Sequence, residues 1–215
     1  MVEQTLIDVG PVPKFTPVDK STFEPIKEKL PNSLFEKNRA RFFKLFKEKV
    51  NVNDQNKAVA LFKGANEVPL YSSDVAYPEY QEAFFYYLSG VFEMDCYLLM
   101  DFNTEKTILF VPKMDNLYKI WMNTMTKEDF TQKYGLETRY LNELQEYMAV
   151  ECGKTTNTTV FVNDGINSDS KLRTDVPEHK YTDGLTVDNT QMHDILSESR
   201  VVKNDEEILA MRWAS

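Results

Sequence analysis

The feature that most constrains this chain is a dense apolar and aromatic run in its first half. The run is QEAFFYYLSGVFE, residues 81–93, and five large side chains stand consecutively at positions 84–88. Ser89 and Gly90 interrupt the run before two further apolar residues. An unbroken run of this kind fits a strand buried on both faces better than an amphipathic helix. We therefore expect residues 84–88 to form the central strand of a sheet.

Size and charge exclude several classes of function. The chain has 215 residues and a formal net charge of -9, so one domain, or one domain with tails, is expected. The basic residues between positions 37 and 49 alternate with apolar ones, which indicates the solvated side of a helix. We expect no nucleic-acid partner. There is no apolar run of membrane-spanning length and no leader pattern at the start, which predicts a cytoplasmic protein with no membrane partner.

The remaining pattern alternates strands and helices, which predicts an α/β fold class: a single domain with a mixed β-sheet flanked by helices. Residues 1–32 are rich in proline and are expected to form an N-terminal arm. Strands are expected at 58–62, 96–102, 106–112 and 158–162. The short polar connection between the second and third of these strands indicates an antiparallel hairpin.

Helices are expected where capping residues precede apolar periodicity. Ser33 and Glu36 form a capping-box pattern, and Arg39 falls on the predicted outer face of the helix that follows. Thr126 is expected to cap a second helix that ends at Gly135. Further helices are expected at 140–151, at 188–199, and after a cap that begins at position 204.

The sequence lacks the patterns of the common catalytic sites. Its two histidines, His179 and His193, stand in neither an HxxxH nor an HExxH spacing, and the glycines are scattered singly rather than forming a phosphate loop. There is no GxSxG motif. Cys96 and Cys152 are too few for a disulfide framework, and Cys96 is expected to be a buried thiol. We expect no catalytic residue, no metal ligand and no cofactor in this chain.

Several separated segments nevertheless resemble one known family. The resemblance begins with Gln81 and YLSG at 87–90. The further matching segments are CYLLMD at 96–101, TILFVP at 107–112, IWM at 120–122, KEDF at 127–130 and ESRVVK at 198–203. Over about residues 34–215 the chain resembles the N-terminal domain of Xaa-Pro dipeptidases (prolidases), which is of the creatinase/aminopeptidase P type.

The resemblance implies a division of labour. Enzymes of this family cleave Xaa-Pro dipeptides with two divalent metals, here expected to be manganese, held by two Asp, one His and two Glu of a C-terminal pita-bread domain. The catalytic pita-bread domain is absent from this sequence. The resemblance implies an N-terminal α/β domain at 33–200. Residues 201–215 would be a linker and the truncated first helix of the missing catalytic domain.

The implied role of such a domain is dimerisation and restriction of substrate access. Trp121 and Asp74 match residues at the substrate entrance, with Trp121 reaching the active site of the partner in a homodimer. Glu79 and Tyr80 stand where relatives have an aromatic residue and an arginine, so an arginine-based substrate clamp is not expected. Without the resemblance, Trp121 could be a core residue and Asp74 a turn residue.

Two other functions remain open. The chain could be the N-terminal domain of an aminopeptidase P, or a non-enzymatic binding module of the same architecture, such as those of histone chaperones. The reading frame beyond Ser215 would distinguish them, because the five metal ligands are either present downstream or missing.

Overall fold

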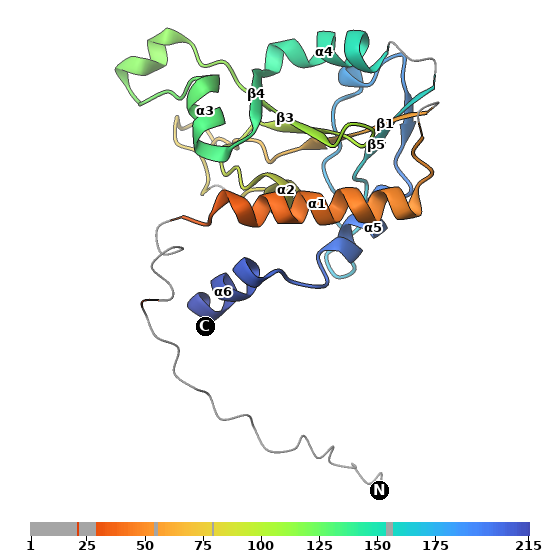
Figure 1. The fold of residues 1–215 in the computed structure, drawn as a ribbon. Helices are drawn as coiled ribbons and strands as arrows, with labels where there is room; N and C mark the ends of the chain where they lie inside the picture. The colour runs from red at the N-terminus through yellow and green to blue at the C-terminus, as the bar shows by residue number, and fades with distance from the viewer. Residues whose placement is uncertain (1–20, 22–28, 54–55, 79, 154–156) are drawn as a thin grey trace, which may run out of the picture.

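The computed structural model describes residues 21, 29–53, 56–78, 80–153 and 157–215 (Figure 1). The expected N-terminal arm, residues 1–32, lies almost entirely outside the described residues. The rest is an α/β domain in which one mixed sheet separates two layers of helices. Figure 1 shows α1, α2 and α5 on one face of the sheet and α4 on the other.

The sheet has six strands in the order β4-β3-β2-β1-β5-β6. Their bounds are β1 Lys57–Lys63, β2 Tyr97–Asp101, β3 Lys106–Val111, β4 Glu137–Tyr140, β5 Thr158–Val162 and β6 Thr186–Asp188. β2 is antiparallel to both of its neighbours, and the other pairs are parallel. This confirms the predicted mixed sheet and the β2–β3 hairpin. The two edge strands, β4 and β6, are short and polar, and were not expected.

The main correction concerns the aromatic run. Residues 84–88 are not the central strand; they lie in a helix, α2, Ala83–Ser89. The Glu82 side chain caps the helix by accepting a hydrogen bond from the Phe85 amide at 2.7 Å, and Gly90, at φ 69°, ends it. Four of the seven residues of α2 are buried, and Phe85 and Leu88 are fully buried. A short buried helix and a buried strand give the same continuous apolar run, so periodicity could not separate them.

Helix α1, Asn32–Lys49, packs its phenylalanines against one face of the sheet. Phe42, Phe43 and Phe46 surround Phe102, which follows β2; the Phe46 and Phe102 rings stack with centroids 3.6 Å apart. The opposite face of the sheet is covered around Leu144. The sheet therefore has a core on each side, as strands buried on both faces require.

Two expectations for α1 are wrong. Ser33 is not its cap: the helix starts at Asn32 with no side-chain cap, and the Ser33 hydroxyl donates to Glu206 at 3.2 Å. Arg39 does not face solvent: it is 7% exposed and donates to the Leu88 carbonyl at 2.9 Å. The guanidinium thereby satisfies a carbonyl at the end of α2 that the helix itself leaves unpaired. Burial lowers the pKa of Arg39, although the charge of Glu36 opposes this shift.

The other helices follow their predicted caps more closely. Helix α3, Lys127–Tyr134, has the expected capping box at Thr126 and ends at Gly135, at φ 67°. Helices α5, Met192–Ser199, and α6, Asp205–Ala214, are present, and α6 begins with a capping box. The helix expected at 140–151 is divided into three short pieces. They are a 3₁₀ turn at Leu141–Glu143, helix α4 at Leu144–Tyr147 and a π-helical turn at Met148–Cys152.

Within the described residues, no helix is both long enough and apolar enough to cross a bilayer. Both cysteines are free and buried. Burial raises the pKa of Cys152 to about 11 and that of Cys96 further still, so neither thiol is an available nucleophile near neutral pH.

Candidate functional site

The strand register brings the C-terminal ends of several strands to one edge of the sheet. Lys63, at the end of β1, pairs with Tyr97, and Tyr97 pairs with Phe110 near the end of β3. β4 runs parallel to β3, and β5 runs parallel to β1. We call this the carboxyl edge. In open α/β sheets, ligands bind beyond the carboxyl ends of strands, so this edge is where a site is expected.

One connection that leaves the carboxyl edge, residues 112–126 after β3, exposes many apolar side chains. We call it the Trp121 segment. Asp115 caps its 3₁₀ turn, Asn116–Ile120, by accepting from the Leu117 amide at 2.9 Å, and no residue of that turn is buried. The exposed apolar side chains are Met114, Leu117, Tyr118, Ile120, Trp121 and Met122.

Trp121 itself is 83% exposed, which excludes the alternative of a core tryptophan. Figure 1 shows the segment projecting from the domain beside α3. Residues 119–124 line a hollow of about 620 Å³. The segment is therefore a self-capped projection that presents a large aromatic face, rather than a part of the core.

The connection after β1 carries Asp74. Residues 64–78, the Asp74 loop, fold back on themselves: the Leu70 amide donates to Val75 O at 2.7 Å, and the Tyr77 amide to Val68 O at 2.9 Å. Asp74 is exposed near the turn of this loop.

The turn is held by Ser73, whose hydroxyl accepts from the Val75 amide at 3.1 Å, and not by Asp74. The Asp74 carboxylate has no hydrogen-bond or ion-pair partner among the described residues, so the turn-residue alternative is not supported. Trp121 and Asp74 thus lie in two different connections that start from the same edge.

Gln81, which begins the aromatic run, has a structural role. Its amide oxygen accepts from the Ala65 amide at 2.7 Å, and its amide nitrogen donates to Glu93 O at 2.9 Å. These bonds fasten the start of the Asp74 loop to the segment after α2. Gln81 thus fixes the base of the Asp74 loop against the rest of the domain.

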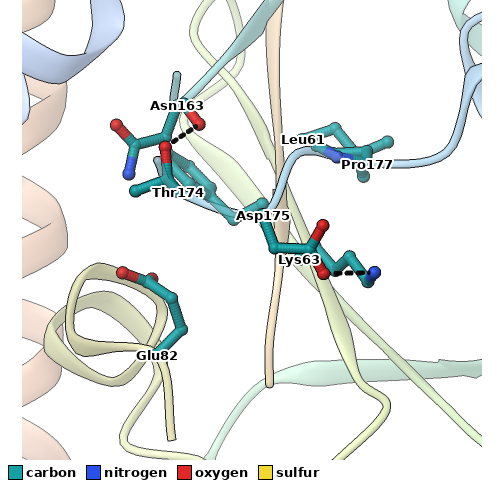
Figure 2. A pocket seen from close by; sticks show the side chains of 8 residues that line it. Leu61, Lys63, Glu82, Asn163, Thr174, Asp175 and Pro177 are labelled. Carbon is teal, nitrogen blue, oxygen red and sulfur yellow. Dashed lines mark hydrogen bonds and ion pairs between the residues drawn. The ribbon is translucent and has the colours of Figure 1, made fainter. Parts of the chain in front are cut away.

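The third connection, after β5, is tied to β1 around a small cavity (Figure 2). Lys63 pairs with Asp175 at 2.5 Å, and the Thr174 hydroxyl donates to Asn163 O at 3.0 Å. The cavity, about 10 Å³ in volume, is also lined by Glu82. It has room for about one water molecule, so these contacts hold the connection in place and do not form a ligand site.

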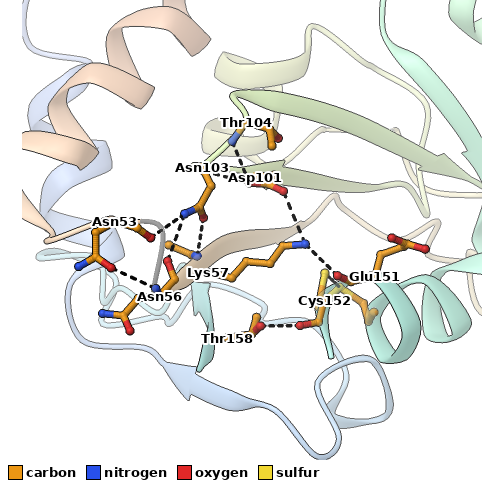
Figure 3. Close-up of polar contacts among 11 residues, drawn as sticks. Asn53, Asn56, Lys57, Asp101, Asn103, Thr104, Glu151, Cys152 and Thr158 are labelled. Carbon is orange, nitrogen blue, oxygen red and sulfur yellow. Dashed lines mark hydrogen bonds and ion pairs between the residues drawn. The ribbon is translucent and has the colours of Figure 1, made fainter. Parts of the chain in front are cut away.

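The opposite edge of the sheet holds a polar cluster around Lys57 and Asn103 (Figure 3). Lys57 donates to Glu151 O at 2.8 Å and lies 3.7 Å from an Asp101 oxygen. The Asn103 side chain accepts from the Ala58 amide at 2.9 Å and donates to two backbone carbonyls at 3.1 Å. Most of these bonds end on backbone atoms, so the cluster fixes the start of β1 against the β2–β3 turn.

The part of the chain that the structure describes does not fit a two-metal centre. It contains no group of three or more His, Cys, Asp or Glu side chains placed to hold a metal ion. His179 lies in a 3₁₀ turn, and His193 Nδ1 lies 3.1 Å from Asn163 Oδ1. A dinuclear site needs several carboxylates and an imidazole that converge on the metals, so we assign no hydrolytic step to these residues.

The fold defines the class: an α/β domain with a mixed sheet and long exposed connections at one edge. Residues 35–161 match the family described as aminopeptidase P, N-terminal domain. The chain belongs to this family.

The chain is 30% identical over 190 residues to Xaa-Pro dipeptidase of Rattus norvegicus, a match that covers 87% of this chain and 37% of the relative. It is 29% identical over 192 residues to Xaa-Pro dipeptidase of Homo sapiens, with the same two coverages of 87% and 37%. A probable Xaa-Pro aminopeptidase of Aspergillus niger is 31% identical over 146 residues, covering 66% of this chain and 28% of the relative. The chain thus spans little more than a third of the length of the dipeptidases it matches.

A solved structure of a variant of Escherichia coli aminopeptidase P superposes with a TM-score of 0.64 at 20% identity, covering 86% of this chain and 42% of that one. A zinc-substituted form of the E. coli enzyme in complex with product gives a TM-score of 0.61 at 20% identity, with the same coverages. At this identity, the likeness shows the fold alone.

Proposed function

We propose that this chain is the non-catalytic N-terminal domain of an Xaa-Pro dipeptidase-type metallopeptidase, in which it mediates homodimerisation and restricts access to the catalytic site. The observation that carries the proposal is the Trp121 segment, which exposes six large apolar side chains from one short connection. Such a patch is rarely left in water unless it forms an interface. The relatives named Xaa-Pro dipeptidase supply the reaction class.

A domain can restrict access to a site by steric exclusion alone, without a catalytic group of its own. An exposed tryptophan offers a rigid apolar face at little cost in entropy, and this suits contact with a prolyl ring. Asp74 lies on a loop of the same sheet edge, and its carboxylate, which has no partner among the described residues, suits contact with the amino terminus of a dipeptide. In the proposed homodimer, both residues line the entrance to the active site of the partner subunit.

Hydrolysis belongs, in this proposal, to a second domain that holds two divalent metals, for which we propose manganese. Helix α6 supports a neighbour of this kind, because none of its residues is buried within the described chain and Ile208, Met211 and Trp213 are exposed. We propose that residues 201–215 form the linker and the first helix of that domain. Two buried free thiols also suit the cytoplasm, where we place the protein.

A second candidate is the N-terminal domain of an Xaa-Pro aminopeptidase, which the Aspergillus niger relative favours. The two differ in substrate length: a dipeptidase admits only dipeptides, whereas an aminopeptidase accepts longer peptides with proline in second place. Comparing Gly-Pro with a longer peptide of the same start in the full-length protein distinguishes them.

The proposal is tested with Trp121→Ala in the full-length protein. We expect Gly-Pro turnover to fall by about tenfold or more through lost substrate positioning. The thermal midpoint of the 215-residue chain should stay within about 1 °C of the parent, because the side chain is exposed. Val150→Ala, an exposed apolar residue outside the carboxyl edge, should change neither property. Undiminished turnover together with an unchanged subunit assembly in Trp121→Ala would refute the proposal.

A further inference from the structure

A second concave surface lies between the start of α2, the end of α5 and residues 165–174, which we call the finger. Its volume is about 670 Å³, which falls in the range of about 300–1,000 Å³ typical of small-molecule sites. The Trp121 segment and the Asp74 loop do not contribute to its walls. The cleft is therefore separate from the surface assigned to the proposed function.

The finger is held in shape by its own hydrogen bonds. The Thr174 amide donates to Gly165 O at 2.9 Å, and the Asn167 amide donates to Leu172 O at 2.9 Å. The Asn167 side chain accepts from two amides of the turn at 2.9 Å each. The wall of the cleft is thus formed before any ligand arrives, which lowers the entropy lost on binding.

The base of the finger is fixed to α5 by a close approach that requires glycine. A Cβ atom at Gly165 would lie 1.9 Å from His193 Nδ1, so the imidazole ring lies directly against the glycine. The Phe84 ring also contacts this imidazole in a T-shaped arrangement, with centroids 5.4 Å apart. The finger, α2 and α5 therefore meet at His193, which lies among the residues that line the cleft.

Arg200, at the end of α5, supplies the charge of the cleft. Its guanidinium lies over the Phe84 ring, 4.7 Å from the centroid, and 5.8 Å from the centroid of Tyr87. Among the described residues, no carboxylate pairs with Arg200 and no acceptor receives its side-chain N–H groups. The two ring contacts hold the guanidinium at the wall of the cleft by cation–π attraction, and its N–H groups are left for an external acceptor.

The other charged groups of the cleft are already engaged. Arg173 contacts both oxygens of Asp164, at 2.6 and 2.8 Å. Asp175 pairs with Lys63, and the Glu82 carboxylate caps α2. Arg200 is therefore the cation of this wall that is left for an external anion, and the planar fork of an arginine matches the two oxygens of a carboxylate.

Apolar side chains complete the cleft. Ile166 and Leu172 belong to the finger and are 53% and 72% exposed, and Phe84 also lines the cleft. We propose that the cleft binds a ligand that carries a carboxylate next to an apolar side chain, such as the C-terminal residue of a peptide. Arg200 binds the carboxylate, and Leu172 and Ile166 contact the apolar side chain. This assignment does not depend on the proposed function.

The test is a titration of the ¹⁵N-labelled 215-residue chain with N-acetyl-leucine, followed by amide chemical shifts. We expect saturable shifts confined to the finger, the start of α2 and the end of α5. The matched neutral probe, N-acetyl-leucinamide, should bind about tenfold more weakly, because it lacks the charge-assisted hydrogen bonds. Equal binding of the acid and the amide, or an absence of saturable shifts in the cleft, would overturn the proposal.

Two variants assign the roles within the cleft. Arg200→Lys keeps the charge but loses the planar fork, so N-acetyl-leucine should bind about fivefold more weakly; Arg212→Lys, an exposed arginine on α6, is the matched control and should change nothing. Leu172→Ser removes an exposed apolar contact and should also weaken binding, with little risk to folding. Unchanged affinity in Leu172→Ser, or in a folded Arg200→Lys, contradicts the assignment.

Discussion

Phe102 offers the sharpest test of how helix α1 is held against the sheet. Its side chain is fully buried between the sheet and α1. It stacks on Phe46 at 3.6 Å between centroids and meets Phe42 and Phe43 edge-on at 5.7 and 5.5 Å. Phe102→Ala removes all three ring contacts and leaves a cavity that the surrounding rings cannot fill without moving.

The loss of unfolding free energy expected for Phe102→Ala follows from these contacts. Truncating a buried phenylalanine costs about 3–5 kcal/mol, and because each aromatic pair adds about 0.5–1.5 kcal/mol beyond burial, we expect a value near the upper end, about 5 kcal/mol. That is a large part of a total stability of about 5–15 kcal/mol. For a chain of this length, the thermal midpoint should fall by about 10–20 °C.

Urea unfolding followed by far-ultraviolet circular dichroism measures this loss. Tryptophan fluorescence is a poor probe here, because Trp121 and Trp213 are both exposed in the folded chain. Phe92→Ala is the matched control. Because the Phe92 ring is 52% exposed, this variant should lose less than about 1 kcal/mol of unfolding free energy. A loss below about 2 kcal/mol for Phe102→Ala, at an unchanged urea dependence, would refute the packing described for α1.

Two further predictions concern backbone conformation and pH. Gly90→Ala should cost at least about 2 kcal/mol of unfolding free energy, because φ is 69° and the new Cβ would lie 2.4 Å from a phenylalanine ring. Gly184→Ala is the control: its φ is 74° but nothing lies within 4 Å of the new Cβ, so it should cost only about 1 kcal/mol. Equal losses of unfolding free energy in the two variants would contradict the steric argument. Burial opposes ionisation of Glu93, but hydrogen bonds from Lys133 and Tyr134 outweigh it and lower the pKa of Glu93 below its ordinary 4.5. This carboxylate therefore stabilises the fold above pH 4.5 and loses its effect as the pH falls through the lowered pKa. The thermal midpoint of Glu93→Gln should fall less than that of the parent on acidification, and an equal fall would show that this contact does not contribute.

Several elements were predictable because their signals are local. The β2–β3 hairpin follows from two apolar runs joined by a short polar turn. Helix α3 follows from the Thr126 cap and from Gly135, which accommodates a left-handed conformation.

Other features depended on partners distant in the sequence. The helical pattern predicted that Arg39 faces solvent. In the structure, α2 places the Leu88 carbonyl 2.9 Å from its guanidinium, and Arg39 is buried. The edge strands β4 and β6 carry few apolar residues, because most of their side chains are not buried, so no apolar run marked them. The cleft at Arg200 could not be foreseen, because its walls come from segments that start at positions 82, 165 and 193.

The sequence by itself determined the class of fold and the four inner strands of the sheet, because alternation, caps and turns act over a few residues. Only the tertiary structure decided that residues 84–88 are a helix, because a buried strand and a buried helix share one apolar pattern. It also decided that Trp121 and Asp74 lie in connections from the same edge. That placement depends on the parallel direction of β1 and β3 on either side of β2, a relation between strands that local sequence does not encode.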